Sequence, residues 1–148
     1  MHSYSRILVA IDLKDESLLV ARRGQAIAQA GGGEPLLLHV VEYIPVDPMG
    51  DNALPPTQLI DELVGAARKR LIALATQLGV PADHCSVEVG SVKAEIVRSA
   101  RNQHCDLIVL GAHERHGLSI FLNFTEDTVL HAAPCDVLAV RVGASGPA

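Results

Sequence analysis

The chain of 148 residues has no tryptophan, two phenylalanines and two tyrosines, so aromatic residues make up only 3% of it. Its core must therefore be built from aliphatic side chains, and hydrophobic residues do reach 49% of the chain. Charged residues account for 20%. This balance predicts a packed globular protein rather than a disordered one. We expect a single domain over residues 1–148, with 143–148 as a frayed tail.

Basic clusters and long apolar runs are also missing. Lysine and arginine number 12 against 17 aspartates and glutamates, and no stretch concentrates the basic residues. Binding to nucleic acid or to an anionic membrane surface is therefore not expected. No apolar run approaches the roughly 20 residues that span a bilayer. The first twelve residues do not have the pattern of a signal peptide, so we expect a cytoplasmic protein.

Cysteine is scarce and odd in number, with Cys85, Cys105 and Cys135. In a chain without an export signal this predicts small buried side chains with reduced thiols. His84 precedes Cys85 and His104 precedes Cys105, which raises the question of a metal site. Adjacent strand residues point to opposite faces, and zinc needs several converging ligands, so no metal is predicted.

Apolar, β-branched runs predict strands over 5–12, 35–43, 84–90, 105–112 and 135–142. Helical periodicity covers 15–33, 58–79, 92–103 and 124–133; glycines end the first of these helices, and a Pro/Gly-rich loop fills 44–56. The side chains expected to face inward are Leu19, Ala26, Ile27 and Ala30; Leu59, Leu63, Ala67, Leu71, Leu74 and Leu78; and Ile96, Val97 and Ala100.

Strict alternation of strands and helices predicts an α/β fold, an open five-stranded parallel sheet with helices on both faces. The strongly apolar first and fourth strands belong in the middle, which gives the strand order 3-2-1-4-5. A crevice then opens at their carboxyl ends, where such sheets bind ligands. Asp12 and Gly111 are expected to face each other across it.

Asp12 is the strongest single candidate for a functional residue. A carboxylate at the end of a central strand is costly unless it meets solvent, a hydrogen-bond donor or a ligand. It is either an anchor for a base or sugar, or an acceptor for its own loop and the helix that follows, alongside Asp15 and Ser17. No phosphate-loop signature follows any strand, and a dinucleotide fingerprint is absent after the first strand. A Gly-x-Ser-x-Gly elbow is absent too, and no catalytic residue is predicted.

Several segments resemble the universal stress protein family: "RILVAID", "HVVE", "VEVGSVKAEIV", "CDLIVLGAHERHGLS" and "VLHAAPCDVLAVRV". The resemblance runs almost end to end. It implies a flavodoxin-like fold, also described as adenine nucleotide alpha hydrolase-like. It further implies a protein, usually a homodimer, that is produced in the cytoplasm under stress or growth arrest.

One branch of that family binds ATP through Gly-x-x-Gly, nine residues, and Gly-Ser or Gly-Thr. By this resemblance Gly111 matches the first glycine and Thr125 the hydroxyl position, while Glu114 and Phe124 replace the other two glycines. Glycine is needed where a backbone touches phosphate or turns with positive φ. The chain therefore resembles the glycine-poor branch, which is not known for tight ATP binding.

The alternative function is ATP binding through this degenerate loop, and in that case the protein could also have a weak ATPase activity. The resemblance then implies contacts from Asp12, Val40, Val41, Gly111, His113, Arg115, Gly117, Phe124 and Thr125. One feature argues against ATP binding. Asn123 and Glu126 have nearly the pattern of a capping box, in which side chains accept hydrogen bonds from the backbone amides that a phosphate would use. No cofactor is therefore required by the sequence.

The last strand is predicted to lie at a sheet edge, where unpaired backbone groups invite pairing. The resemblance implies a homodimer in which two such strands meet across a two-fold axis. The interface residues would be Val137, Leu138, Ala139, Val140, Arg141 and Val142. The function expected from the sequence is a dimeric interaction module in stress response, without catalytic machinery and with protein partners still to be identified.

Overall fold

A computed structural model describes residues 3–42, 57–113 and 125–142, without the side chains of residue 113 and of residues 125–128. The elements are β1 (Arg6–Ala10), α1 (Ser17–Gly31), β2 (Glu34–Glu42), α2 (Thr57–Leu78), the short 3-10 helix η1 (Ala82–His84), β3 (Cys85–Gly90), α3 (Val92–Asn102), β4 (Leu107–His113), α4 (Thr125–Ala132) and β5 (Asp136–Val142). The predicted loop 44–56 and tail 143–148 lie outside the described residues.

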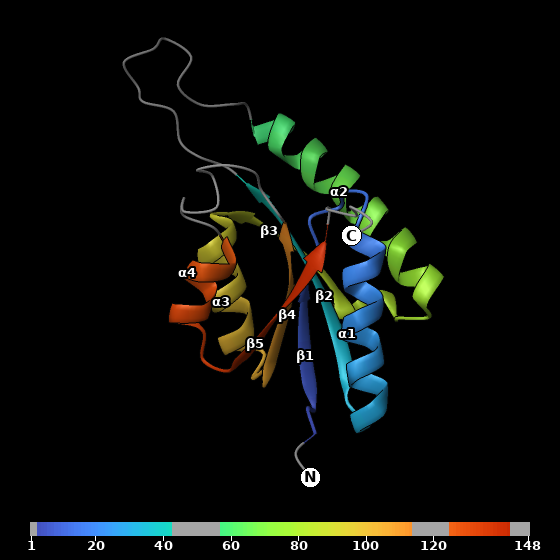
Figure 1. Ribbon diagram of the computed structural model, residues 1–148. Helices are drawn as coiled ribbons and strands as arrows, with labels where there is room; N and C mark the ends of the chain where they lie inside the picture. The colour runs from blue at the N-terminus through green and yellow to red at the C-terminus, as the bar shows by residue number, and fades with distance from the viewer. Residues whose placement is uncertain (1–2, 43–56, 114–124, 143–148) are drawn as a thin grey trace, which may run out of the picture.

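The five strands form one parallel sheet in the order β3-β2-β1-β4-β5, which confirms the predicted order and the central place of β1 and β4. Helices α1 and α2 cover one face of the sheet, and α3 and α4 cover the other (Figure 1). The fold is therefore the predicted three-layer α/β arrangement.

Burial on both faces explains why the central strands read as unbroken apolar runs. On β1, Ile7 and Val9 face the core under α1 and α2, while Leu8 faces the core under α3 and α4. All three side chains are 0% exposed. Strands β3 and β5, at the two edges, have mixed burial patterns.

The predicted inward face of α1 is wrong. Leu19 is 46% exposed, and Ala26 and Ala30 are also exposed, while Ile27 is half-buried. The buried residues of α1 are Ser17, Val20, Ala21, Gly24 and Ala28. A Cβ on Gly24 would come within 2.5 Å of Val9 Cγ2, so the helix approaches β1 through a residue that carries no side chain.

The glycine stop of α1 is confirmed, because Gly32 caps the helix in the left-handed conformation with φ 70°. Its N–H donates to Gln29 O, and the N–H of Gly33 donates to Ala28 O. These bonds satisfy carbonyls that the helix end would otherwise leave unpaired. The chain then turns directly into β2.

Helix α2 buries Ala67 and Leu71 as predicted, but Leu59 and Leu63 are 43% and 48% exposed. The prediction for these two leucines is wrong because the first turns of α2 extend beyond the carboxyl ends of the strands (Figure 1). Helix α3 buries Ile96 and Ala100 as predicted.

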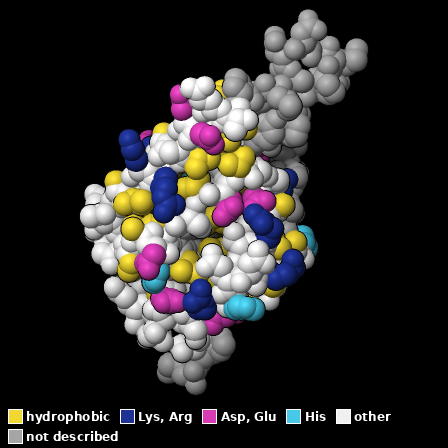
Figure 2. All heavy atoms as spheres, turned by 180° about the vertical axis from the view of Figure 1, so that it is seen from behind, with side chains coloured by type: hydrophobic (Ala, Val, Ile, Leu, Met, Phe, Trp, Pro, Cys, Tyr) yellow, Lys and Arg dark blue, Asp and Glu magenta, His cyan; other side chains and the backbone are white. Residues whose placement is uncertain are grey.

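Every helix in the described part of the chain falls short of the length or apolar character needed to cross a bilayer. On the face shown in Figure 2, basic and acidic side chains are interspersed with apolar ones. That view contains no field of a single charge sign.

Candidate functional site

The turn after β1 carries Asp12 to the carboxyl edge of the sheet. Strand β4 is the parallel neighbour of β1, and their register pairs Val9 with Val109. Gly111 lies two residues beyond Val109, and Asp12 three residues beyond Val9. The two predicted crevice residues therefore end up at the same edge of two adjacent strands.

The Asp12 carboxylate is used within its own turn. Its Oδ1 accepts the backbone N–H of Lys14 at 2.9 Å and the hydroxyl of Ser17 at 3.0 Å. Ser17 is 6% exposed and begins α1. This geometry matches the interpretation of Asp12 as an acceptor for its own loop and helix. Its interpretation as a ligand anchor stays a prediction.

Neighbouring elements fix the backbone on either side of Asp12. The N–H of Ile11 donates to Leu38 O at 2.8 Å, and the ring Nδ1 of His39 lies 2.7 Å from Ile11 O. Because a carbonyl oxygen only accepts, His39 Nδ1 carries the proton. Together these contacts tie the end of β1 to β2 (Glu34–Glu42).

Leu13 has φ 61°, a left-handed conformation that costs a bulky residue about 1–2 kcal/mol. Its side chain is buried in the core under α1 and α2, and its carbonyl oxygen accepts a hydrogen bond from Arg70 Nη2 on α2. Strain of this kind persists where surrounding contacts over-determine the backbone. Sequence reasoning missed Arg70 and His39, because nothing in the spacing of distant residues indicates that they hold this turn.

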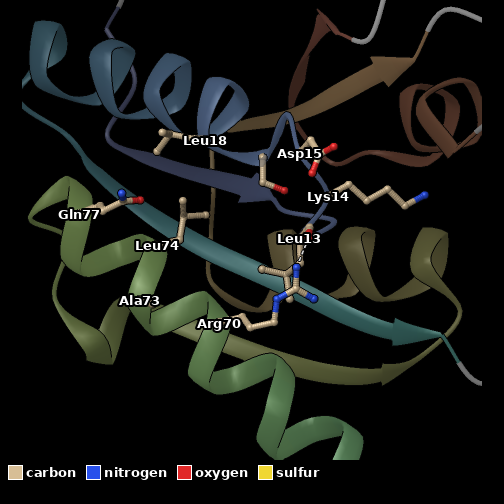
Figure 3. A pocket seen from close by; sticks show the side chains of 9 residues that line it. Leu13, Lys14, Asp15, Leu18, Arg70, Ala73, Leu74 and Gln77 are labelled. Carbon is tan, nitrogen blue, oxygen red and sulfur yellow. Dashed lines mark hydrogen bonds between the residues drawn. The ribbon is translucent and has the colours of Figure 1, made fainter.

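A shallow hollow of about 550 Å³ lies beside the same turn, between the start of α1 and the second half of α2 (Figure 3). We call it the α1–α2 hollow; Leu13, Leu18, Ala73 and Leu74 supply its apolar lining, and Lys14, Asp15, Ser17, Arg70 and Gln77 its polar lining. Asp12, Val40, Val41 and Gly111 do not line it. Lys14 and Ser17, which bind the Asp12 carboxylate, do line it, so the hollow lies next to the predicted contact Asp12.

The other predicted nucleotide contacts are only partly within the described structure. Val40 is 8% exposed in the core under α3 and α4, whereas Val41 is half-buried and packs on the opposite core. Gly111 is half-buried and pairs with Val140 of β5. The side chains of His113, Thr125 and Glu126 lie outside the described residues, as do Glu114, Arg115, Gly117, Asn123 and Phe124 entirely.

All three cysteines are free; Cys85 and Cys105 are buried and Cys135 is half-buried. Burial raises the pKa of the Cys105 thiol to about 11, and it also raises the pKa of Cys85 and of Cys135. A reactive cysteine needs a lowered pKa, so these thiols match the predicted core role.

His84, which precedes Cys85, has contacts other than the neighbouring thiol. His84 Nδ1 lies 3.1 Å from Pro35 O, and its Nε2 lies 3.9 Å from the Glu34 carboxylate, while Cys85 is buried. Within residues 3–42, 57–113 and 125–142, the His, Cys, Asp and Glu side chains form no group of three or more that could hold a metal ion.

Strand β5 lies at the edge of the sheet, as predicted, and pairs with β4. Val140 and Val142 are 4% and 3% exposed and belong to the core under α1 and α2. Ala139 and Arg141 are exposed, and Val137 and Leu138 are half-buried. The predicted interface residues are therefore divided between the core and the surface.

The profile of the Universal stress protein family matches residues 3–141. Universal stress protein A homolog 2 of Coxiella burnetii is 35% identical over 146 residues, which cover 98% of this chain and 100% of that protein. The structure of universal stress protein UspA from Lactobacillus plantarum is similar with a TM-score of 0.66 and 27% identity, covering 95% of this chain and 100% of that one. A universal stress protein solved in complex with cAMP is similar with a TM-score of 0.60 and 21% identity, covering 95% of this chain and 98% of that one.

Proposed function

Because this chain belongs to the universal stress protein family, we propose that it acts in the stress response as a homodimeric interaction module of the cytoplasm, without catalytic turnover. In this proposal the protein works by presenting surfaces to other proteins. The three cysteines are free, which supports a reducing compartment. Burial raises the pKa of each of these thiols. They also give no support to a thiol-based activity.

The observation that carries the proposal is the engagement of Asp12 by Lys14 N–H and the Ser17 hydroxyl. A carboxylate that is committed to its own turn is a poorer anchor for a ligand, because binding must compete with existing hydrogen bonds. Glu114 and Phe124 stand where the ATP-binding branch has glycines, which points the same way. In this proposal the fold is retained, while the glycines that would contact phosphate are replaced.

The test of this part is to denature the purified protein and analyse the released small molecules by absorbance and chromatography. The proposal predicts no stoichiometric nucleotide. Adenosine phosphate released at about one molecule per chain would contradict it, since such retention requires a dissociation constant well below the protein concentration.

The homodimer is supported by the edge position of β5 and by its exposed Ala139. If two β5 strands meet across a two-fold axis, Ala139→Asp brings like charges together and weakens the dimer. Ala132→Asp on α4, also at an exposed alanine, is the matched control. Sedimentation velocity should show a shift toward monomer for the first variant alone; equal behaviour of both variants would refute dimerisation through β5.

A second candidate function is nucleotide binding at the edge formed by β1 and β4. Two observations favour it: Asp12 and Gly111 lie at the same sheet edge, and a protein of the same fold has been solved with cAMP. A ligand that binds the folded state raises the melting temperature as its concentration increases. Thermal unfolding with Mg-ATP and with cAMP therefore tests this candidate, and an unchanged melting temperature for both would reject it.

A further inference from the structure

The turn after β1 lies between two neighbouring surfaces. Asp12 belongs to the carboxyl edge of the sheet, beside the end of β4. Leu13, Lys14 and Ser17 line the α1–α2 hollow. The Asp12 carboxylate accepts its hydrogen bonds from Lys14 N–H and the Ser17 hydroxyl, so residues that line the hollow hold a carboxylate at the sheet edge.

Two side chains anchor the backbone of this turn by its carbonyl oxygens. His39 Nδ1 lies 2.7 Å from Ile11 O, on the residue before Asp12. Arg70 Nη2 donates to Leu13 O, on the residue after Asp12 (Figure 3). The backbone around Asp12 is therefore fixed from β2 on one side and from α2 on the other.

One peptide unit joins the Arg70 contact to the Asp12 contact. The carbonyl of Leu13 and the N–H of Lys14 belong to the same peptide bond, which is planar and rigid, and the two groups point in opposite directions. Arg70 binds the oxygen of this unit, and the Asp12 carboxylate binds its N–H at 2.9 Å. A rotation of the unit that breaks one of these hydrogen bonds must therefore disturb the other.

The conformation of Leu13 favours such a rotation. Its φ of 61° lies in the left-handed region, which a leucine rarely adopts. A strained residue of this kind keeps its conformation only while surrounding contacts hold it. Its buried side chain, 9% exposed, is one such contact, and the hydrogen bond from Arg70 to its carbonyl oxygen is another.

The partners at the two ends of this peptide unit are accessible to water. Arg70 and Asp12 are both exposed, whereas Leu13 and Ser17 are buried. Water can replace an exposed hydrogen-bond partner without unfolding the core, so bonds of this kind open locally. The guanidinium can thus leave Leu13 O while α2 stays in place.

We propose that the Leu13–Lys14 peptide unit is a switch with two orientations and that Arg70 is its latch. While the guanidinium binds Leu13 O, the unit presents Lys14 N–H to Asp12, whose carboxylate is committed to its turn. When Arg70 leaves, the unit rotates and the carboxylate loses this donor. A change at the hollow thereby alters a carboxylate at the sheet edge. This inference goes beyond the proposed function and depends on neither dimerisation nor nucleotide binding, because it concerns the turn alone.

Amide hydrogen exchange of the full chain, followed by NMR, tests the latch. Arg70→Met keeps most of the aliphatic length and removes the donors, and it should accelerate exchange of Lys14 N–H by roughly tenfold. The N–H groups of Ile11 and Cys105, which donate to backbone carbonyls outside the turn, should keep their rates. Arg68→Met changes another exposed arginine of α2 and should leave Lys14 unaffected.

A combined variant separates positioning of Asp12 from general support of the fold. In Asp12→Ala, Lys14 N–H has lost its carboxylate acceptor. Adding Arg70→Met to that variant should therefore change Lys14 exchange by less than about twofold. An equal effect of Arg70→Met with and without Asp12 would show that Arg70 does not act through the carboxylate, and it would overturn the proposal.

Urea gives a second test on the unmodified chain. Local opening exposes little surface, so low concentrations of urea should hardly change Lys14 exchange while they accelerate exchange of Cys105 N–H in the core. A dependence on urea as steep for Lys14 as for Cys105 would contradict a local switch. Unchanged Lys14 exchange in Arg70→Met, or equal acceleration at Lys14, Ile11 and Cys105, would also overturn the proposal.

Discussion

Replacing Asp12 tests whether its carboxylate serves the turn after β1. Asp12→Ala removes the acceptor for the Ser17 hydroxyl, at 3.0 Å, and for Lys14 N–H, at 2.9 Å. Ser17 is 6% exposed, so its hydroxyl cannot turn freely to water. Leaving such a group unpaired costs about 1–3 kcal/mol. A carboxylate near a helix N-terminus adds about 0.3–1 kcal/mol.

We therefore expect Asp12→Ala to lower the free energy of unfolding by about 2–3 kcal/mol in urea denaturation at fixed protein concentration. Asp12→Asn keeps an oxygen at the acceptor position and should lose only about 0.3–1 kcal/mol, the part due to charge. The comparison of the two variants thus separates hydrogen bonding from the helix dipole.

A double-mutant cycle makes the test specific. Asp12→Ala and Ser17→Ala should show a coupling of about 1 kcal/mol, because each removes the same hydrogen bond. Ser99→Ala changes another buried serine, 8% exposed on α3, and should be additive with Asp12→Ala. A coupling between Asp12 and Ser17 below about 0.3 kcal/mol would refute the claim that the carboxylate is committed to its turn.

Two further predictions concern packing and titration. Gly24→Ala should destabilise the fold by about 1–3 kcal/mol, because its Cβ would meet Val9 Cγ2 at 2.5 Å. Gly65→Ala on α2, with nothing within 4 Å of its Cβ, should stabilise by about 0.5–1 kcal/mol, and urea denaturation measures both. Burial raises the pKa of the Cys105 thiol from 9.0 to about 11, so the folded state favours the protonated thiol. The contribution of this thiol to the stability of the fold is therefore complete below pH 9.0 and is lost as the pH rises toward 11. Its alkylation should be slow at neutral pH and accelerate toward pH 11; fast neutral alkylation of the folded protein would contradict this.

The fold was predictable because its central strands are buried on both faces. Residues such as Leu8 and Val9 on β1 face opposite cores, so the strand reads as an unbroken apolar run. Strict alternation with amphipathic helices then leaves few topologies, since crossovers between parallel strands are right-handed. The strand order followed from the apolar character of β1 and β4.

The helix faces were harder to predict. Gly24 lies at the contact of α1 with Val9, and a glycine carries no apolar signal although it permits the closest approach. Leu59 and Leu63 fit the periodicity of α2, yet they are exposed because the first turns of the helix extend beyond the carboxyl ends of the strands. Periodicity indicates which side of a helix is apolar, but it does not indicate how much of the helix length packs against the sheet.

At the candidate site, the sequence pointed to Asp12, but it could not identify what holds the turn. Arg70 lies 57 residues from Leu13 in the chain, and the left-handed Leu13 has no signature in a single sequence. Leucine is uncommon at positive φ, so sequence patterns place a glycine or asparagine there instead. The turn became visible only through its tertiary contacts.

A calorimetric titration of the full chain with Mg-ATP tests directly whether the end of β1 has lost its capacity to hold a nucleotide. If the Asp12 carboxylate serves its own turn and Glu114 and Phe124 replace the phosphate-contacting glycines, no saturable heat is expected in the micromolar range. Micromolar binding of one ATP per chain would contradict it.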